Sequence, residues 1–172
     1  MIFRKKKGRI LLNNDLIIDN EVIANVNQTK FLGIIIDRYL SFEPHIRYIK
    51  GKVSRGIGIL CKANKFLNEN TCLTPCYSFI HPYFTYCISI WGNTCISYLD
   101  PLIKSQKRAI RTLSRAKKLD HTSPLFEKHK LLKLDRLYIF AVLVFLHKYI
   151  NRKLPPHFLT SLSAMPPYMI TT

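Results

Sequence analysis

The chain has 172 residues, of which 48% are hydrophobic, so it can bury the core of one compact domain and is not a disordered arm. Its 27 Lys and Arg against 10 Asp and Glu give a net charge of +17, which favours a polyanionic partner, above all nucleic acid. The longest apolar run, LYIFAVLVFL at residues 137–146, falls well short of the roughly 20 residues of a membrane-spanning helix. We expect a buried core helix there and no membrane partner.

The N-terminal segment MIFRKKKGRI indicates no export signal. A secretory signal would need an apolar run of roughly 7 to 15 residues after its charges, and this segment has none. The five cysteines are an odd number, which suits a reducing compartment better than a framework of disulfides. We therefore expect the protein in the nucleus or cytoplasm, not secreted.

Residues 1–40 favour β structure. Residues 16–18 and 21–26 flank an Asp-Asn turn signal, and residues 31–36 are rich in branched side chains. We predict a hairpin and a third strand, all short and antiparallel.

From residue 41 onward the pattern predicts helices. Pro44 suits a first helical turn with Ser41 as a possible cap, and apolar residues follow at helical spacing. These apolar residues are Ile46, Ile49, Val53, Ile57 and Leu60. A second apolar segment runs to Trp91 and should end or kink at Pro82.

Three more helices are predicted in the rest of the chain. The third runs from about Asp100 to Lys118, the fourth starts with Ser123 as cap and Pro124 as first residue, and the fifth covers residues 137–149. The predicted fold class is α+β, mostly α, with short N-terminal antiparallel strands followed by a bundle of about five helices. Four prolines make the last residues a loosely ordered tail.

The strongest chemical signal is LIKSQKRAIRTLSRAKK, residues 102–118. On a helix its basic residues fall on one face and its apolar residues on the other, with only Lys117 outside this pattern. We call the following set the basic stripe: Lys104, Lys107, Arg108, Arg111, Arg115 and Lys118. A solvated helix face is the ordinary alternative. However, like charges at i, i+4 repel, so a face of one sign favours contact with phosphates.

The sequence shows no catalytic or metal site. Cys72, Cys76, His81 and Cys87 approach a zinc-knuckle spacing, but their segment is aromatic and apolar with no Gly, so buried thiols are the better interpretation. No two Asp are adjacent, and there is no P-loop or G-x-S-x-G. We expect no catalytic residue, no metal, no cofactor and no small-molecule substrate. We interpret His45 as a backbone hydrogen-bonding residue.

Five segments resemble a known family when taken in order: FLGIIIDRYLSFEPHI, IKGKVSRGIGIL, YSFIHPYFTYCISIWG, LIKSQKRAIR and HTSPLF. Together they resemble the region downstream of the catalytic palm in reverse transcriptases of non-LTR retrotransposons, of the jockey-like kind. The resemblance covers nearly the whole chain. It implies that Phe31, Leu32 and Gly33 belong to a primer-grip-like strand, and that MIFRKKK is similar to the strand after the catalytic aspartates.

The resemblance also implies a division of the chain. Residues 1–40 would be the edge of a palm, 41–120 a thumb-like helical domain, 121–154 C-terminal helices and 155–172 a Pro-rich tail. The family's Tyr-x-Asp-Asp is absent from this sequence. The implied function is therefore that of a C-terminal fragment of an RNA-directed DNA polymerase, which binds template-primer duplex, RNA or DNA, and is not an enzyme by itself. The alternative is a basic helical protein-interaction module without nucleic-acid function.

Overall fold

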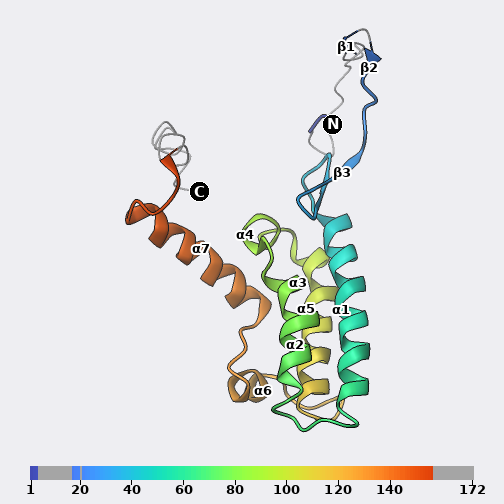
Figure 1. Ribbon diagram of the computed structural model, residues 1–172, viewed down its shortest axis with the longest axis vertical. Helices are drawn as coiled ribbons and strands as arrows, with labels where there is room; N and C mark the ends of the chain where they lie inside the picture. The colour runs from blue at the N-terminus through green and yellow to red at the C-terminus, as the bar shows by residue number, and fades with distance from the viewer. Residues whose placement is uncertain (4–16, 20, 157–172) are drawn as a thin grey trace.

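A computed structural model describes residues 1–3, 17–19 and 21–156 of the chain (Figure 1). Strand β1 (Ile17–Ile18) pairs antiparallel with β2 (Glu21–Val22), and β3 (Gln28–Phe31) pairs antiparallel with β4 (Ile34–Asp37). The helices of this part are α1 (Glu43–Ala63), α2 (Leu73–Phe79), α3 (His81–Thr85), α4 (Ile88–Trp91), α5 (Ile96–Leu113), α6 (Ser123–Lys128) and α7 (Leu134–Ile150). The predicted class, α+β and mostly α with short antiparallel strands, is confirmed.

The third strand predicted over residues 31–36 is present as β4, but its predicted start is wrong, because a tight turn at Leu32 and Gly33 separates β4 from β3. Phe31 pairs with Ile34, and the two residues between them both have positive φ, 44° at Leu32 and 83° at Gly33. Positive φ at both central positions is the geometry of the type I′ turns that close two-residue hairpins. A single glycine within a branched apolar run was too weak a signal to show this turn. The predicted tail from residue 157 onward, and residues 4–16, lie outside the described residues.

Helices α1 and α5 lie side by side and run in the same direction (Figure 1). At one end, the hydroxyl of Thr94 donates a 2.6 Å hydrogen bond to the carbonyl of Ser41. At the other end, the side-chain amide of Asn64 donates to the carbonyl of Thr112. The short helices α2, α3 and α4 return between these ends, so the core lies between α1, α5 and this returning segment.

The apolar residues predicted for α1 are all buried in this core: Ile46, Ile49, Val53, Ile57 and Leu60. On the same face, Gly56 permits a close approach of α1 to α2. A Cβ atom at this position would lie 2.5 Å from the carbonyl oxygen of Phe79 and 2.8 Å from Cγ1 of Ile80. The predicted break near Pro82 is also present, because α2 ends at Phe79 and Pro82 lies in the first turn of α3.

Helix α5 ends five residues before its predicted end at Lys118. The last helical residue is Leu113, and Arg115 takes a left-handed conformation with φ of 53°. The guanidinium of Arg115 donates to the carbonyls of Asn64 and Leu67, at 2.9 and 2.6 Å. Arg115 and Lys118 therefore lie outside the helix on which the basic stripe was placed.

The prediction that residues 137–146 form a buried core helix is wrong. They are helical, as part of α7, but only Leu134 and Leu137 of this helix are buried, and most of its other apolar side chains are exposed. The helix leaves the bundle at an angle (Figure 1). An apolar run shows that a helix needs an apolar partner, but it does not show that the chain itself provides one. Among the described residues, no helix is long and apolar enough to cross a membrane.

The carboxylate of Asp37 joins β4 to α1. It is buried and accepts hydrogen bonds from the backbone N–H of Phe42 at 2.8 Å, the backbone N–H of Tyr39 at 3.1 Å and the hydroxyl of Ser41 at 3.0 Å. The N-cap of α1 is Phe42, so the expected cap Ser41 supports the turn through Asp37 instead. Burial acts to raise the pKa of Asp37, but its hydrogen bonds to Phe42, Ser41 and Tyr39 outweigh burial and lower the pKa.

We expect Asp37→Asn to lower the free energy of unfolding at neutral pH by about 1–3 kcal/mol, because it removes charged hydrogen bonds from a buried site. The folded-state pKa lies below 3.8, so the stabilisation by Asp37 is present above this pH and is lost as the pH falls below it toward the folded-state pKa. Urea unfolding as a function of pH measures both effects. Asp100→Asn is the matched control, since Asp100 forms only an exposed ion pair with Lys104. Equal losses for the two variants would contradict the role of Asp37.

Candidate nucleic-acid interface

The primer-grip-like residues form the exposed tip of the β3–β4 hairpin. Phe31 is 61% exposed and Leu32 is 73% exposed. Leu32 has a left-handed conformation, which costs an L-residue about 1–2 kcal/mol. The hydroxyl of Tyr86 donates a 2.6 Å hydrogen bond to the carbonyl of Leu32, and a Cβ atom at Gly33 would lie 3.6 Å from the ring of Tyr86. An apolar tip is thus held in a strained turn by a residue that sequence reasoning missed.

His45 attaches this hairpin to the start of α1. Its Nδ1 accepts a hydrogen bond from the backbone N–H of Ile35 at 3.3 Å, which agrees with the backbone role predicted for it. Its ring lies edge-on to Trp91, with ring centres 5.9 Å apart. Burial lowers the pKa of His45, so the ring is neutral at neutral pH. The hairpin is therefore fixed to α1 by a buried neutral imidazole.

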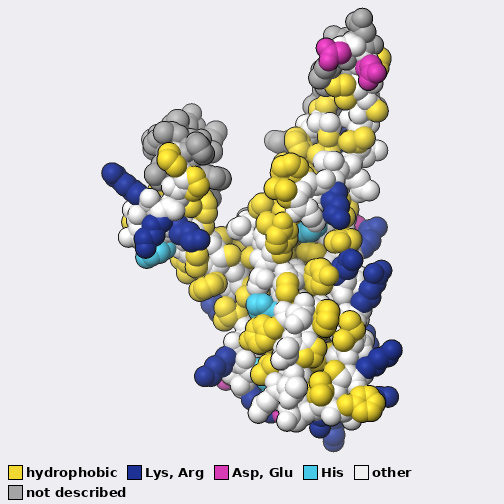
Figure 2. All heavy atoms as spheres, in the orientation of Figure 1, with side chains coloured by type: hydrophobic (Ala, Val, Ile, Leu, Met, Phe, Trp, Pro, Cys, Tyr) yellow, Lys and Arg dark blue, Asp and Glu magenta, His cyan; other side chains and the backbone are white. Residues whose placement is uncertain are grey.

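The paired helices α1 and α5 carry charge of almost one sign. There are five cations on α1 and four on α5, against one acid on each helix. Both acids lie in the first half of their helix, and each pairs with the cation four residues later: Glu43 with Arg47 at 2.7 Å and Asp100 with Lys104 at 2.6 Å. Figure 2 shows the dark-blue Lys and Arg side chains along the edge of the molecule formed by α1. The rest of both helices presents cations without acids.

The four stripe residues on α5 have different surroundings. Lys104 is paired with Asp100, and Nε of Arg111 donates to the carbonyl of Asp120 at 3.0 Å. Lys107 and Arg108 are exposed, and no carboxylate of the described residues lies within ion-pair distance of either. These two residues are the best placed on α5 to contact phosphate.

Beyond the end of α5, the chain turns back so that Lys118 is near Arg108 and Arg111. These three cations share an open hollow, which is lined by Arg108, Arg111, Thr112, Ala116, Lys118 and Leu119. Arg115 points elsewhere, since it holds the loop after α1. Four of the six stripe residues thus share one face of α5, and Lys118 lies near the C-terminal end of this helix. The helical spacing that predicted the stripe holds only up to Leu113.

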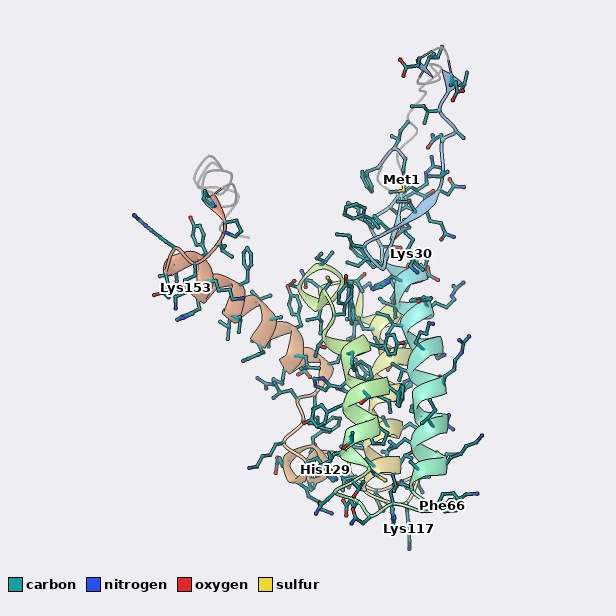
Figure 3. The ribbon with its side chains drawn as sticks, viewed as in Figure 1. Met1, Lys30, Phe66, Lys117, His129 and Lys153 are labelled. Carbon is teal, nitrogen blue, oxygen red and sulfur yellow. The ribbon has the colours of Figure 1, made fainter. Side chains whose placement is uncertain are left out.

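Two lysines that the sequence did not single out extend this charge to the hairpin. The ammonium groups of Lys30 on β3 and Lys52 on α1 each lie 5.5 Å from the ring centre of Tyr48. Figure 3 labels Lys30 at the junction of the hairpin and α1, and Lys117 at the opposite end of the helix pair. No sequence signal connects Lys30 to Tyr48, because hairpin and helix are brought together by the fold.

A cluster of Ser114, His129 and Glu69 resembles a nucleophile with its base but lacks the required geometry. The hydroxyl of Ser114 lies 2.9 Å from Nε2 of His129, and a carboxylate oxygen of Glu69 lies 3.0 Å from the same nitrogen. A catalytic triad needs the acid on the other ring nitrogen. Glu69 also pairs with Lys128 at 2.5 Å, and this bond is the main cause that lowers the pKa of Glu69. The cluster ties α6 to the loop after α1.

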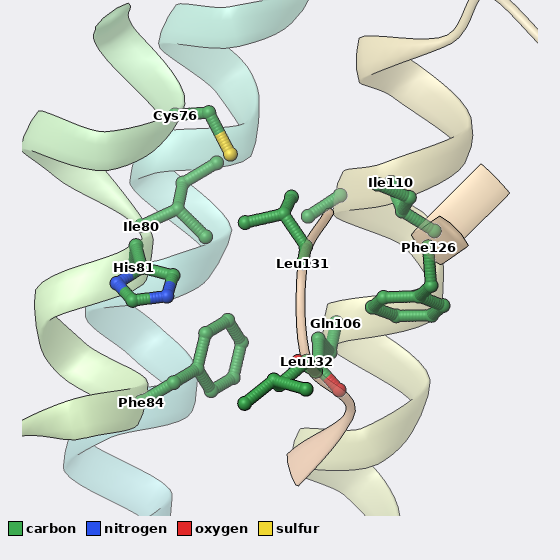
Figure 4. A pocket seen from close by; sticks show the side chains of 10 residues that line it. Cys76, Ile80, His81, Phe84, Gln106, Ile110, Phe126, Leu131 and Leu132 are labelled. Carbon is green, nitrogen blue, oxygen red and sulfur yellow. The ribbon is translucent and has the colours of Figure 1, made fainter. Parts of the chain in front are cut away.

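The described residues also hold no candidate metal site, since no three or more His, Cys, Asp or Glu side chains gather in them. Cys72 and Cys76, from the zinc-like spacing, are buried free thiols, and burial raises the pKa of Cys76 to about 11. The cavity in Figure 4, between α2, α3, α5 and the segment before α7, measures about 20 Å³, room for about one water. Gln106 at its edge accepts from the N–H of Leu134 and donates to the carbonyl of Leu132, both at 3.0 Å.

We expect Tyr86→Phe to loosen the hairpin tip without unfolding the bundle, because it removes only the hydroxyl that holds the carbonyl of Leu32. Hydrogen exchange of the backbone amides at residues 31–34 should become faster, while exchange in α1 and α5 stays unchanged. Tyr77→Phe is the control, since the Tyr77 side chain is exposed on α2, away from the hairpin. The role of Tyr86 would be wrong if both variants left the exchange of the tip unchanged.

Comparison with known proteins gives one informative match. No protein-family model matches the chain, and no solved structure matches it significantly. The chain is 27% identical over 101 residues to the probable RNA-directed DNA polymerase from transposon X-element of Drosophila melanogaster. This match covers 56% of the chain and 11% of the polymerase, so the chain matches only about a tenth of that protein's length. Over these 101 residues, the chain is thus similar to a part of a transposon RNA-directed DNA polymerase.

Proposed function

We propose that this chain is the primer-grip-like and thumb-like C-terminal part of a jockey-like non-LTR retrotransposon reverse transcriptase. In this proposal it binds template-primer duplex in the nucleus or cytoplasm and uses no metal or cofactor of its own. The observation that carries the proposal is the surface of almost one sign on α1 and α5, which Lys30 and Lys52 extend to the β3–β4 hairpin. The relationship to a transposon RNA-directed DNA polymerase supports it.

The cations would contact the phosphate backbone of the duplex. Lys107 and Arg108 are exposed and lack carboxylate partners among the described residues, so their mutual repulsion with neighbouring cations is relieved when phosphates approach. Contacts of this kind position a nucleic acid without reading its sequence. This behaviour suits a part that must hold any template and primer.

The hairpin tip would contact the end of the duplex. Strained backbone at an exposed position often marks a functional site, and Leu32 is such a residue. Its side chain and that of Phe31 offer apolar contacts for sugars or bases, while Lys30, which precedes Phe31 on β3, is available for a phosphate. Tyr86 fixes the position of the tip relative to α3 and α4.

The competing function, a protein-interaction module without nucleic acid, is favoured by a different observation. Helix α7 exposes a large apolar surface, which is typical of protein contacts. This surface does not explain the one-signed charge of α1 and α5, whereas nucleic-acid binding does. The two surfaces can therefore serve different partners, and salt dependence distinguishes them.

We expect Lys107→Gln with Arg108→Gln to weaken duplex binding equally for all sequences. If each residue neutralises one phosphate, the slope of log affinity against log salt should become shallower by roughly two units, at about 0.9 per phosphate. Fluorescence anisotropy with labelled duplex over a range of salt concentrations measures this slope. Gln preserves helix propensity, so the loss reports charge and not folding.

The matched control is Lys148→Gln with Lys153→Gln, which removes two exposed cations near the far end of α7 (Figure 3). This control should leave the slope nearly unchanged. If the two double variants reduce the slope equally, bulk charge attracts the nucleic acid and the surface of α1 and α5 has no special role.

We further expect the purified chain to show no primer extension with any template, whether magnesium or manganese is supplied. Polymerase chemistry needs clustered carboxylates to hold two metal ions, and the described residues contain no such cluster. A gel assay with labelled primer measures extension. Template-dependent incorporation above that of a mock preparation would contradict this part of the proposal.

A further inference from the structure

The exposed side of α7 carries a regular apolar seam. Four residues, which we call the α7 seam, follow each other at spacings of four, three and four: Ile139, Leu143, Leu146 and Ile150. Their exposed fractions are 44%, 56%, 46% and 68%. This spacing is the a/d pattern by which one helix packs along another. The seam is thus shaped for a second helix.

The bundle does not use this seam. Leu134 and Leu137, which are buried, and Ala141, which is partly buried, form the side of α7 that packs on the bundle through α3 and α4. At about 100° per residue, that side lies opposite the seam. Figure 2 shows the yellow apolar side chains along α7, where it stands away from the bundle. Packing within the described part of the chain therefore leaves the seam open.

The exposed area is comparable to what a dimer requires. The seam and its flanking residues Phe140 and Val142 are on average about half exposed, which gives on the order of 600 Å² per copy at about 200 Å² for a large apolar residue. A standard interface buries roughly 800 Å² per partner. A second copy of the same helix would cover most of this area, because a two-fold interface places the same patch on both sides.

Charge selects the direction of the pairing. The C-terminal end of α7 and the residues after it carry Lys148, Arg152 and Lys153 and no acid. The first turn carries Asp135, which is paired with Arg136 at 3.6 Å. A parallel pair would bring the C-terminal cations of both copies together. An antiparallel pair keeps them apart at opposite ends of the interface and also opposes the helix dipoles favourably.

We propose that α7 is the interface of a homodimer in which two copies of the helix pack antiparallel along the α7 seam. In this dimer Leu143 of each copy packs against Leu146 of the other, at the centre of the seam, and Ile139 packs against Ile150. The dimer is independent of nucleic-acid binding by α1 and α5. Because each copy carries a net charge of +17, added salt strengthens the dimer, whereas it weakens binding to nucleic acid.

Sedimentation velocity of the full chain without nucleic acid tests the dimer. We expect a reversible monomer–dimer equilibrium whose Kd falls as salt is added. Leu143→Glu places a charge at the centre of the seam and should raise Kd at least about tenfold. Val144→Glu makes the same charge change on a neighbouring residue that lies off the seam, and it should alter Kd little. Circular dichroism checks that both variants remain helical.

Spin labels test the direction. With the exposed or half-buried Cys61, Cys87 and Cys95 changed to Ser, a single label at Lys153→Cys should give a distance of about 25 Å across an antiparallel pair and about 10 Å across a parallel one. The short distance would overturn the antiparallel arrangement. A chain that stays monomeric, or for which Leu143→Glu and Val144→Glu act alike, would overturn the dimer and assign the seam to a different polypeptide. A monomer that floats with anionic vesicles would assign the seam to a membrane surface.

Discussion

The buried joint between β4 and α1 determines where the hairpin lies relative to the helices. Asp37 accepts three hydrogen bonds from the turn that follows it. His45, in the first turn of α1, accepts one hydrogen bond from the backbone of β4. A hairpin of two four-residue strands is only marginally stable alone in water. The position of the hairpin therefore depends on these polar contacts and on the hydrogen bond from Tyr86 to Leu32. The same contacts determine where the exposed tip lies.

The parallel arrangement of α1 and α5 gives the molecule its one-signed surface. Two helices that each carry cations repel when they lie side by side, so their apolar faces must supply the attraction, with Val53, Leu60 and Leu102 fully buried between them. Part of the charge is used to hold the structure, as the contacts of Arg111 and Arg115 with backbone carbonyls show. The cations left over are the ones available to a ligand.

Helix α7 shows the limit of reasoning from apolar patterns. The apolar positions of α1 could be predicted because polar residues separate them at a helical period, which identifies one buried face. In residues 137–146 every position is apolar, so the pattern identifies a helix but no face. The turn at Leu32 and the end of α5 at Leu113 were missed for a related reason, since each depends on a contact with a residue about fifty positions away.

The sequence alone determined the helical content, the buried face of α1 and the basic character of the surface. These properties follow from local composition and periodicity, which need no knowledge of distant contacts. Only the tertiary structure decided which cations are free, that Tyr86 holds the hairpin tip, and that the seam of α7 faces away from the bundle. Each of these depends on segments far apart in the chain, whose meeting is set by the packing of the whole fold and by no single stretch of residues.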